Sequence, residues 1–483
     1  MFGTCFSGIL FITPITKLFE LTNDSYVGPH HLLLPDYSKF ALYTSLILAI
    51  AVLYYFIVST QTIYKNNSIF IIFVTAIIIL SLGLYPPIYD PIYYFSASYA
   101  WVYQEINVFT SLVAYYSNNP FPFINIPMIH NYAYGPFWLI ISGLITLISK
   151  NSFWVFLFIL RVITTAILAL IVILVKRMQP ALSNRSLILF IFLNPIILLF
   201  GIPSGSMEIL LTLLVILAIL LIKDNHLALA CIILPISILI KISILPIVLL
   251  LYGWLITKLI KQISPIKQII LMATPIVVYI FIVTNIFGVN TNYFQGISEF
   301  LDLEKTHGMT IANVFSYAIS QLFSFPNAHY LIRLGINNLL IFIYGLIFLL
   351  LLIRTTFHRH SDHENNIVRR IWLIMWIGLA LTGIVIKPWY AIPPTIISLL
   401  LPRQYQQISL INIFLIIIAD LFSSIFLLFP NLSNFALLLM ILVALFSAVI
   451  PTILSLLVFR EINTANLNSN ISSAIKKIIP IIR

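Results

Sequence analysis

The sequence predicts an all-α, polytopic membrane protein. Of its 483 residues, 61% are hydrophobic and only 8% are charged, whereas an ordinary soluble domain carries about 25% charged residues. The mean hydropathy is +1.09, and the apolar residues fall in long continuous blocks, as helices that cross a bilayer require. These observations exclude a soluble globular protein, a disordered chain and a nucleic-acid-binding module. The lack of alternation within the blocks also excludes a β-barrel.

Fourteen apolar blocks each predict a helix. They lie near 41–60, 69–86, 136–149, 153–175, 186–201, 206–222, 226–241, 243–257, 267–287, 334–354, 367–386, 389–401, 408–429 and 433–458. The block 136–149 is short and begins Pro-Phe-Trp, so we expect it to lie along the outer surface. About 13 transmembrane helices remain. The chain 1–483 shows no fixed-period repeat and no low-complexity linker, which indicates a single membrane domain.

The basic residues set the expected orientation. With 13 spans, 17 of the 25 Lys and Arg residues fall on one side of the membrane, and the positive-inside rule assigns that side to the cytoplasm. The opposite side then carries two larger outer loops, 87–152 and 288–333. In the first loop, 91–104 and 106–117 predict short interfacial helices, whose aromatic residues would lie at headgroup depth.

An acidic residue stands at the start of the first outer loop. Asp90 follows an apolar block and precedes Pro91, which favours a helix start at this point. Asp90 could simply cap the helix over 91–104. Alternatively, a carboxylate held at the membrane surface could act as a general base.

Aromatic and acidic residues mark two further outer elements. His130, Tyr132 and Tyr134 close the first outer loop; they could be interfacial anchors, or their rings could bind a sugar. Glu208 follows the turn 201–207 and would lie in the first turn of a helix, where the helix dipole favours an anion.

Four cations are expected at outer ends of spans. They are Lys241, Lys387, Arg161 and Arg333. Lys241 could simply snorkel to the interface, or the four cations together could bind a lipid phosphate. The His-rich stretch 358–364 is expected in a solvated cytoplasmic loop, and no nucleotide-binding or paired-Cys zinc motif occurs. The sequence therefore predicts no metal site.

Together, the motifs of the outer face resemble those of the GT-C superfamily of integral-membrane glycosyltransferases. The resemblance is strongest to the dolichyl-phosphate-mannose-dependent mannosyltransferase I of glycosylphosphatidylinositol synthesis and to prokaryotic polyprenyl-phosphate-mannose transferases. It covers about 85–400 and rests on motifs in consistent order, which are Tyr89-Asp90-Pro91, Tyr132-Ala133-Tyr134-Gly135-Pro136, Asn194-Pro195 with Gly205-Ser206-Met207-Glu208, Lys241 with Pro246, and Lys387 with Trp389 and Tyr390. Many relatives carry a second acid beside the first. Here Asp90 stands alone, and Glu105 is the next acid along the chain.

The resemblance implies transfer of a monosaccharide, mannose or another hexose, from a polyprenyl-phosphate sugar to a lipid-linked or glycan acceptor. The reaction would take place on the non-cytoplasmic face, with inversion and with Asp90 as general base. The donor phosphate would be bound by Lys241, Lys387, Arg161 and Arg333. The sugar or acceptor would be bound by Glu105, His130, Tyr132, Tyr134, Glu208, Trp389 and Tyr390.

No cofactor is expected from this chemistry, although a divalent cation could assist it. The membrane would be a prokaryotic plasma membrane or the endoplasmic reticulum, and nucleic acid is not an expected partner. The alternative function is a transporter or flippase of lipid-linked sugars, which would use the same aromatic and basic residues. Transporters often contain repeated halves with broken helices, and the sequence shows no such repeat.

Overall fold

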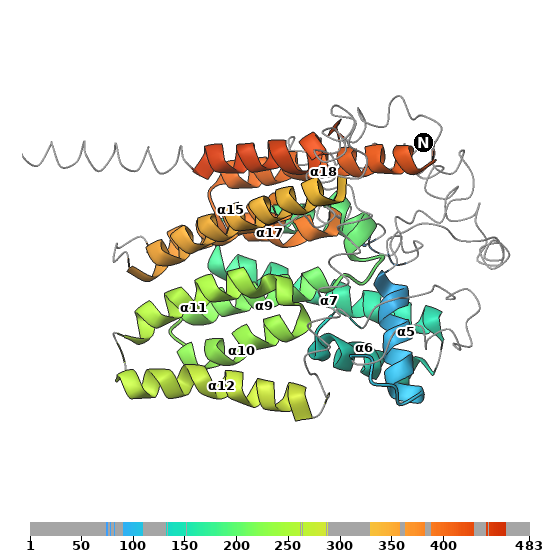
Figure 1. The fold of residues 1–483 in the computed structure, drawn as a ribbon, viewed down its shortest axis with the longest axis horizontal. Helices are drawn as coiled ribbons and strands as arrows, with labels where there is room; N and C mark the ends of the chain where they lie inside the picture. Colours follow the sequence, from blue (N-terminus) through green and yellow to red (C-terminus); the bar gives the residue numbers. More distant parts are fainter. Residues whose placement is uncertain are drawn as a thin grey trace, which may run out of the picture.

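The computed structural model describes a helical chain over most of the predicted blocks (Figure 1). The described residues are 74, 75, 78, 82, 90–109, 132, 134–150, 152–260, 262, 264–285, 287, 329–357, 363–381, 388–428, 441, 442 and 444–459. Over these residues all regular elements are helices and none is a strand. The all-α prediction is therefore confirmed. The block 41–60, most of 69–86 and most of the outer loop 288–333 lie outside the described residues.

The helices follow the predicted blocks closely. Their bounds are α5 (Asp90–Tyr103), α6 (Pro136–Ser149), α7 (Phe153–Met178), α8 (Asn184–Phe192), η4 (Ile197–Gly201), α9 (Met207–Lys223), α10 (Leu227–Ile240), η5 (Ile242–Ile244), α11 (Leu245–Leu259), α12 (Pro265–Asn285), α15 (His329–Phe357), α16 (His363–Leu381), η7 (Pro388–Ala391), α17 (Ile392–Ile397), η8 (Ser398–Leu400), α18 (Arg403–Leu428) and η9 (Leu445–Val449). At the centre, α9 packs against α7, α10 and α17.

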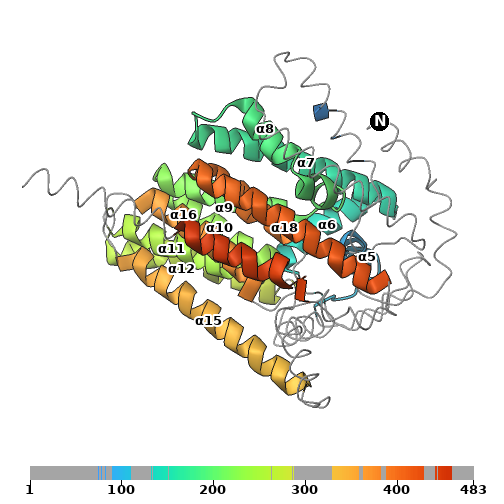
Figure 2. The same cartoon turned by 90° about the horizontal axis from the view of Figure 1, so that it is seen from above.

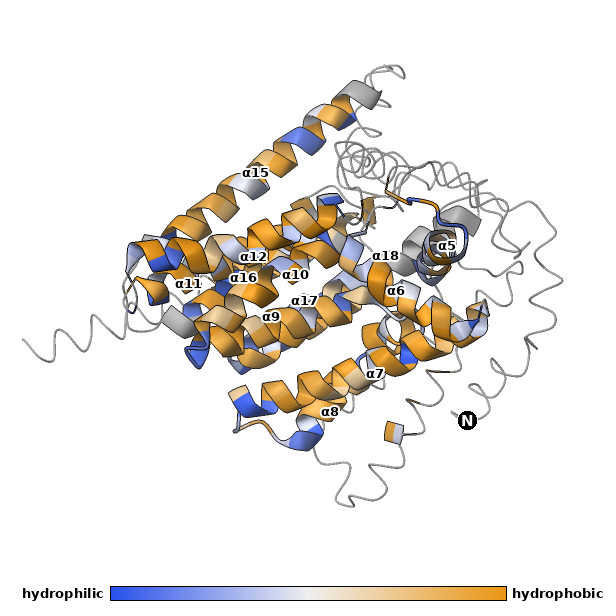
Figure 3. Ribbon diagram, turned by 90° about the horizontal axis from the view of Figure 1, so that it is seen from below, coloured by the Kyte–Doolittle hydropathy of each residue, from blue (hydrophilic) through white to orange (hydrophobic). Residues whose placement is uncertain are grey.

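Four of the described helical segments are long and apolar enough to cross a membrane. They are Phe153–Met178, Ile242–Leu259, Pro265–Asn285 and Ile332–Thr356. On α12 and α15 the ribbon is mostly hydrophobic (Figure 3), and large apolar side chains such as Phe281 and Phe342 are more than 60% exposed. Such surfaces suit lipid rather than water. The prediction of a membrane protein is confirmed, whereas the number of about 13 spans stays a prediction.

The helix α5 runs crosswise to α9–α12, at one end of the long helices (Figure 1), and is seen almost along its axis from above (Figure 2). This course is that of the helix predicted for 91–104. Three of its aromatic residues, Tyr93, Tyr94 and Phe95, are buried, and α5 packs against α6 and α7; the predicted headgroup depth of its aromatic residues stays a prediction.

The prediction of a second interfacial helix over 106–117 is wrong for the residues that the structure describes. Residues 106–109 are not helical, and 110–117 lie outside the described residues. Glu105 adopts a left-handed φ of 56°, while the Ala100 carbonyl accepts from both the Gln104 and Ile106 N–H groups. The Asn107 side chain then accepts from the Phe109 N–H at 3.1 Å. These hydrogen bonds end α5 and replace those of a following helix.

The block 186–201 is broken at Asn194-Pro195 into α8 and η4. Pro195 lacks an N–H group, and the Asn194 carboxamide oxygen accepts from the Ile196 N–H at 3.0 Å. A turn then leads to α9, with Gly205 at φ 55°. A Cβ at Gly205 would lie 2.3 Å from Cγ of Leu160, so the turn packs closely on α7 and sets where α9 begins.

Candidate functional site

A largely buried ion pair joins the start of α9 to the end of α10. Lys241 Nζ lies 2.7 Å from Oε1 of Glu208, and the two side chains are 15% and 4% exposed. The other carboxylate oxygen of Glu208 accepts a hydrogen bond from Ser206 Oγ at 2.6 Å. Glu208 lies in the first turn of α9, where the positive end of the helix dipole stabilises its charge. The Glu208 carboxylate is therefore stabilised by Lys241, by Ser206 and by the helix dipole of α9.

Two tyrosine rings flank the ammonium group of Lys241. Its Nζ lies 4.2 Å from the ring centroid of Tyr390 and 5.7 Å from that of Tyr134, within the range of cation–π attraction. Tyr390 belongs to η7, and Tyr134 lies two residues before α6. With Glu208, four of the predicted motifs, far apart in sequence, thus meet at one cation.

Gly135 brings Tyr134 to this cation. Its N–H donates to the Ile240 carbonyl at 2.9 Å, and an added Cβ would lie 1.9 Å from the Leu239 carbonyl oxygen. Only glycine fits this approach of the Tyr134 segment to the last turn of α10. The end of the first outer loop is thereby joined to the residue before Lys241.

Asp90 is connected to the same group of side chains through Tyr94. The Tyr94 hydroxyl donates to Oδ2 of Asp90 at 3.5 Å, and its ring lies edge-on to Tyr134 with centroids 5.2 Å apart. Burial, reinforced by the Asp90 carboxylate, raises the pKa of Tyr134 well above its usual value. Tyr134 therefore remains a neutral phenol beside Asp90. Asp90, Tyr134, Glu208, Lys241 and Tyr390 are called the outer cluster below.

The remaining tyrosine of the loop closure is a core residue. Tyr132 is fully buried, stacks on Tyr93 at 5.3 Å and lies 5.7 Å from Tyr134. Both Tyr132 and Tyr134 are enclosed by protein, which contradicts the alternative of interfacial anchors. Trp389 is likewise buried, with its ring 5.8 Å from that of Tyr390.

Arg161 donates hydrogen bonds to two backbone carbonyls. Its Nε donates to the Pro203 carbonyl at 2.8 Å and its Nη1 to the Leu82 carbonyl at 2.6 Å. The guanidinium thus fixes the turn that leads to Glu208. Arg333 is buried at the start of α15, a helix that packs chiefly against α11 and α16. His130 and Lys387 lie outside the described residues.

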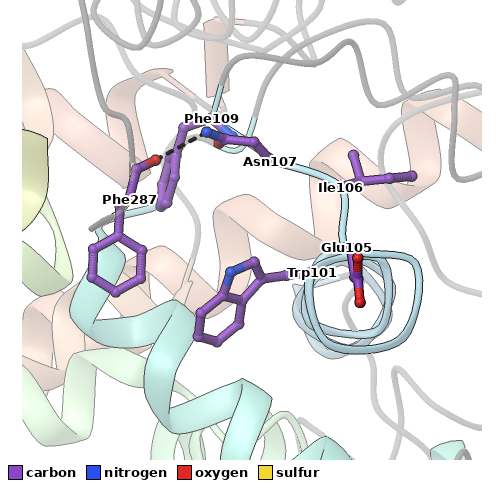
Figure 4. A pocket seen from close by; sticks show the side chains of 6 residues that line it. All are labelled: Trp101, Glu105, Ile106, Asn107, Phe109 and Phe287. Atoms are coloured by element: carbon purple, nitrogen blue, oxygen red, sulfur yellow. Dashed lines mark hydrogen bonds between the residues drawn. The ribbon is translucent and has the colours of Figure 1, made fainter. Parts of the chain in front are cut away.

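Glu105 lies at the other end of α5 from Asp90. Its exposed side chain borders a small pocket with Trp101, Ile106, Asn107, Phe109 and Phe287 (Figure 4). A helix of this length separates its ends by about 20 Å. Glu105 is therefore not a substitute for Asp90 at the same reacting centre.

Three residues of the site were missed from the sequence. Ser206 and Gly135 stand inside the quoted motifs, so their neighbours could have drawn attention to them. Tyr94 is four residues after Asp90 and faces it one helical turn later. Within the described part of the chain, no three His, Cys, Asp or Glu residues come together as metal ligands, and the expected lack of a cofactor stays a prediction.

Known proteins provide one comparison with this site. Residues 73–258 match the model of the MptA_B family, described as Alpha-(1->6)-mannopyranosyltransferase, N-terminal domain. The match includes Asp90, Tyr134, Glu208 and Lys241 but not Tyr390. It supports a GT-C-type membrane glycosyltransferase that transfers mannose; a closer likeness to the glycosylphosphatidylinositol enzyme stays a prediction. No curated protein and no solved structure matches the chain.

Proposed function

We propose that the protein transfers mannose from a polyprenyl-phosphate donor to a lipid-linked or glycan acceptor on the non-cytoplasmic face of the membrane. The observation that carries this proposal is the outer cluster. It unites a candidate base, Asp90, with a cation, Lys241, at the end where α5 crosses the long helices. The family match over 73–258 supports mannose as the sugar.

Asp90 would act as the general base. Its carboxylate would take the proton of the acceptor hydroxyl as that oxygen attacks the anomeric carbon. The new bond joins the acceptor oxygen to the anomeric carbon, and the bond from that carbon to the phosphate oxygen breaks. The products are the mannosylated acceptor and a polyprenyl phosphate.

Lys241 would stabilise the phosphate as negative charge develops on the leaving oxygen. Because Glu208 neutralises it at 2.7 Å, the pair alone adds no net positive charge to the site. A second cation is needed, and Lys387 is proposed for it because it comes three residues before Tyr390 in the chain. Glu208, Ser206 and Tyr390 would hold Lys241 in place for the phosphate.

The linkage of the product follows from the same proposal. The matched family is described by an α-(1→6) linkage, and we propose that linkage here. A single displacement inverts the anomeric carbon, so an α-linked product requires a β-linked phosphate donor. Tyr134, in the outer cluster, would border the sugar. No cofactor is needed for these steps.

The test is transfer of radiolabelled mannose by the purified protein from β-linked polyprenyl-phosphate mannose, measured first without and then with EDTA. Asp90→Asn should lose at least about a hundredfold in kcat, the contribution of a general base. Asp224→Asn is the matched control, because Asp224 forms an exposed ion pair with Arg177.

Full activity of Asp90→Asn would refute Asp90 as the base. Lack of transfer by the wild type, together with movement of the donor lipid between leaflets of a vesicle, would instead favour the flippase. Loss of wild-type activity on adding EDTA would show that a divalent cation takes part.

A further inference from the structure

We propose that the pocket at the C-terminal end of α5 is a second carbohydrate site, which binds a sugar of the acceptor chain remote from the reacting hydroxyl. The inference rests on the proposed function, because it assumes a glycan acceptor. The pocket has a volume of about 260 Å³. Pockets for drug-sized ligands measure roughly 300–1,000 Å³, so this one suits a single sugar ring.

The lining of the pocket has the chemistry of a sugar site. Trp101, which is partly exposed, offers an apolar ring for the C–H face of a sugar, and the buried rings of Phe109 and Phe287 complete the apolar lining (Figure 4). Glu105 offers carboxylate oxygens that can accept hydrogen bonds from sugar hydroxyls. The negative charge disfavours a phosphate, so the ligand class is a neutral glycan and not the donor.

The pocket is held rigid on two sides. A Cβ at Gly143 would lie 2.7 Å from Cζ3 of Trp101, so the indole rests directly on the α6 backbone. Asn107 Nδ2 donates to the Phe287 carbonyl at 3.0 Å, which ties the end of α5 to the chain after α12. Such preorganisation lowers the entropy that a ligand loses on binding.

The geometry of α5 relates this pocket to the reacting centre. Asp90 is its first residue, and Glu105 follows its last by two. The helix separates the two acids by about 20 Å, a distance that several linked sugars would cover. The inferred ligand is therefore a linear oligosaccharide, with its reacting end at Asp90 and an inner sugar at Trp101.

Binding and transfer test the pocket separately. The probes are linear α-1,6-linked mannose oligosaccharides of about six and two residues, and binding is measured by calorimetry without donor. Glu105→Gln removes a charged hydrogen-bond acceptor and should weaken hexasaccharide binding about tenfold. Trp101→Ala should weaken it further, whereas the control Asp224→Asn should leave it unchanged. In transfer, Glu105→Gln should raise KM for the longer acceptor and not for the disaccharide.

Unchanged hexasaccharide binding in both Glu105→Gln and Trp101→Ala would overturn the inference, as would an equal rise in KM for both acceptors. Because Glu105 is exposed, its variant should fold even where Trp101→Ala does not. Binding of the hexasaccharide through Glu105 without any wild-type transfer would support the pocket while refuting the proposed function.

Discussion

Removal of the Lys241 ammonium tests the central contact of the outer cluster. In Lys241→Met the side chain keeps its length and apolar stem, but Glu208 loses its charged partner. Both side chains are mostly withdrawn from water, at 15% and 4% exposed. Breaking a buried ion pair from one side costs about 3–5 kcal/mol of folding free energy. We expect about 3 kcal/mol, because Ser206 still donates to the Glu208 carboxylate.

Adding Glu208→Gln to this variant should return most of that loss. The glutamine is uncharged, and its side-chain oxygen can still accept from Ser206 Oγ. A double-mutant cycle should therefore give a coupling energy of about 2 kcal/mol. The double variant should nonetheless transfer no mannose, because under the proposed function Lys241 binds the leaving phosphate.

Unfolding is followed by tryptophan fluorescence in one detergent, and transfer is measured on the same samples. Arg177→Met is the matched control. It breaks the Arg177–Asp224 pair, whose side chains are 64% and 28% exposed, and should cost less than about 1 kcal/mol. Wild-type stability of Lys241→Met would refute the buried pair, and wild-type transfer by the double variant would refute the role of Lys241.

Two further substitutions test how the outer cluster is assembled. Gly135→Ala should lower stability by at least about 2 kcal/mol and reduce transfer, since its Cβ would lie 1.9 Å from the Leu239 carbonyl oxygen; Gly345→Ala, which meets nothing within 4 Å, should stabilise α15 by up to about 1 kcal/mol. An equal effect of both on the unfolding temperature would contradict the close approach. Tyr390→Leu should raise KM for the donor about fivefold through loss of a cation–π contact worth about 1 kcal/mol, whereas Tyr390→Phe should keep the wild-type value. A KM raised equally by both changes would assign the effect to the hydroxyl.

The sequence predicts the helices well because long apolar blocks leave few alternatives in a membrane. The block 136–149 coincides with α6, and 153–175 falls within α7. The break at Asn194-Pro195 also follows from local chemistry, since proline cannot donate to the preceding turn. The segment 106–109 misled because aromatic composition does not reveal the left-handed Glu105, which ends α5.

The site is predictable in its membership but not in its pairings. The order of motifs singled out Asp90, Glu208 and Lys241. No local rule predicts that Glu208 and Lys241, 33 positions apart, form an ion pair. Their ion pair depends on how α9 and α10 pack. The same holds for Arg161, whose Nε and Nη1 donate to backbone carbonyls. Side-chain partners of this kind are set by tertiary contacts alone.

Within the first outer loop, the residues on either side of the stretch 110–131 contact each other. The Tyr132 N–H donates to the Val108 carbonyl at 3.0 Å, and the rings of Phe109 and Tyr132 lie 5.7 Å apart. Phe109 and Tyr132 are both buried, and three residues after Tyr132 the Gly135 N–H donates to the Ile240 carbonyl at the end of α10. The residues that flank the stretch 110–131 are therefore held together by a backbone hydrogen bond and a ring contact. The length and composition of 110–131 can therefore change to suit a different acceptor without moving Asp90 or Tyr134.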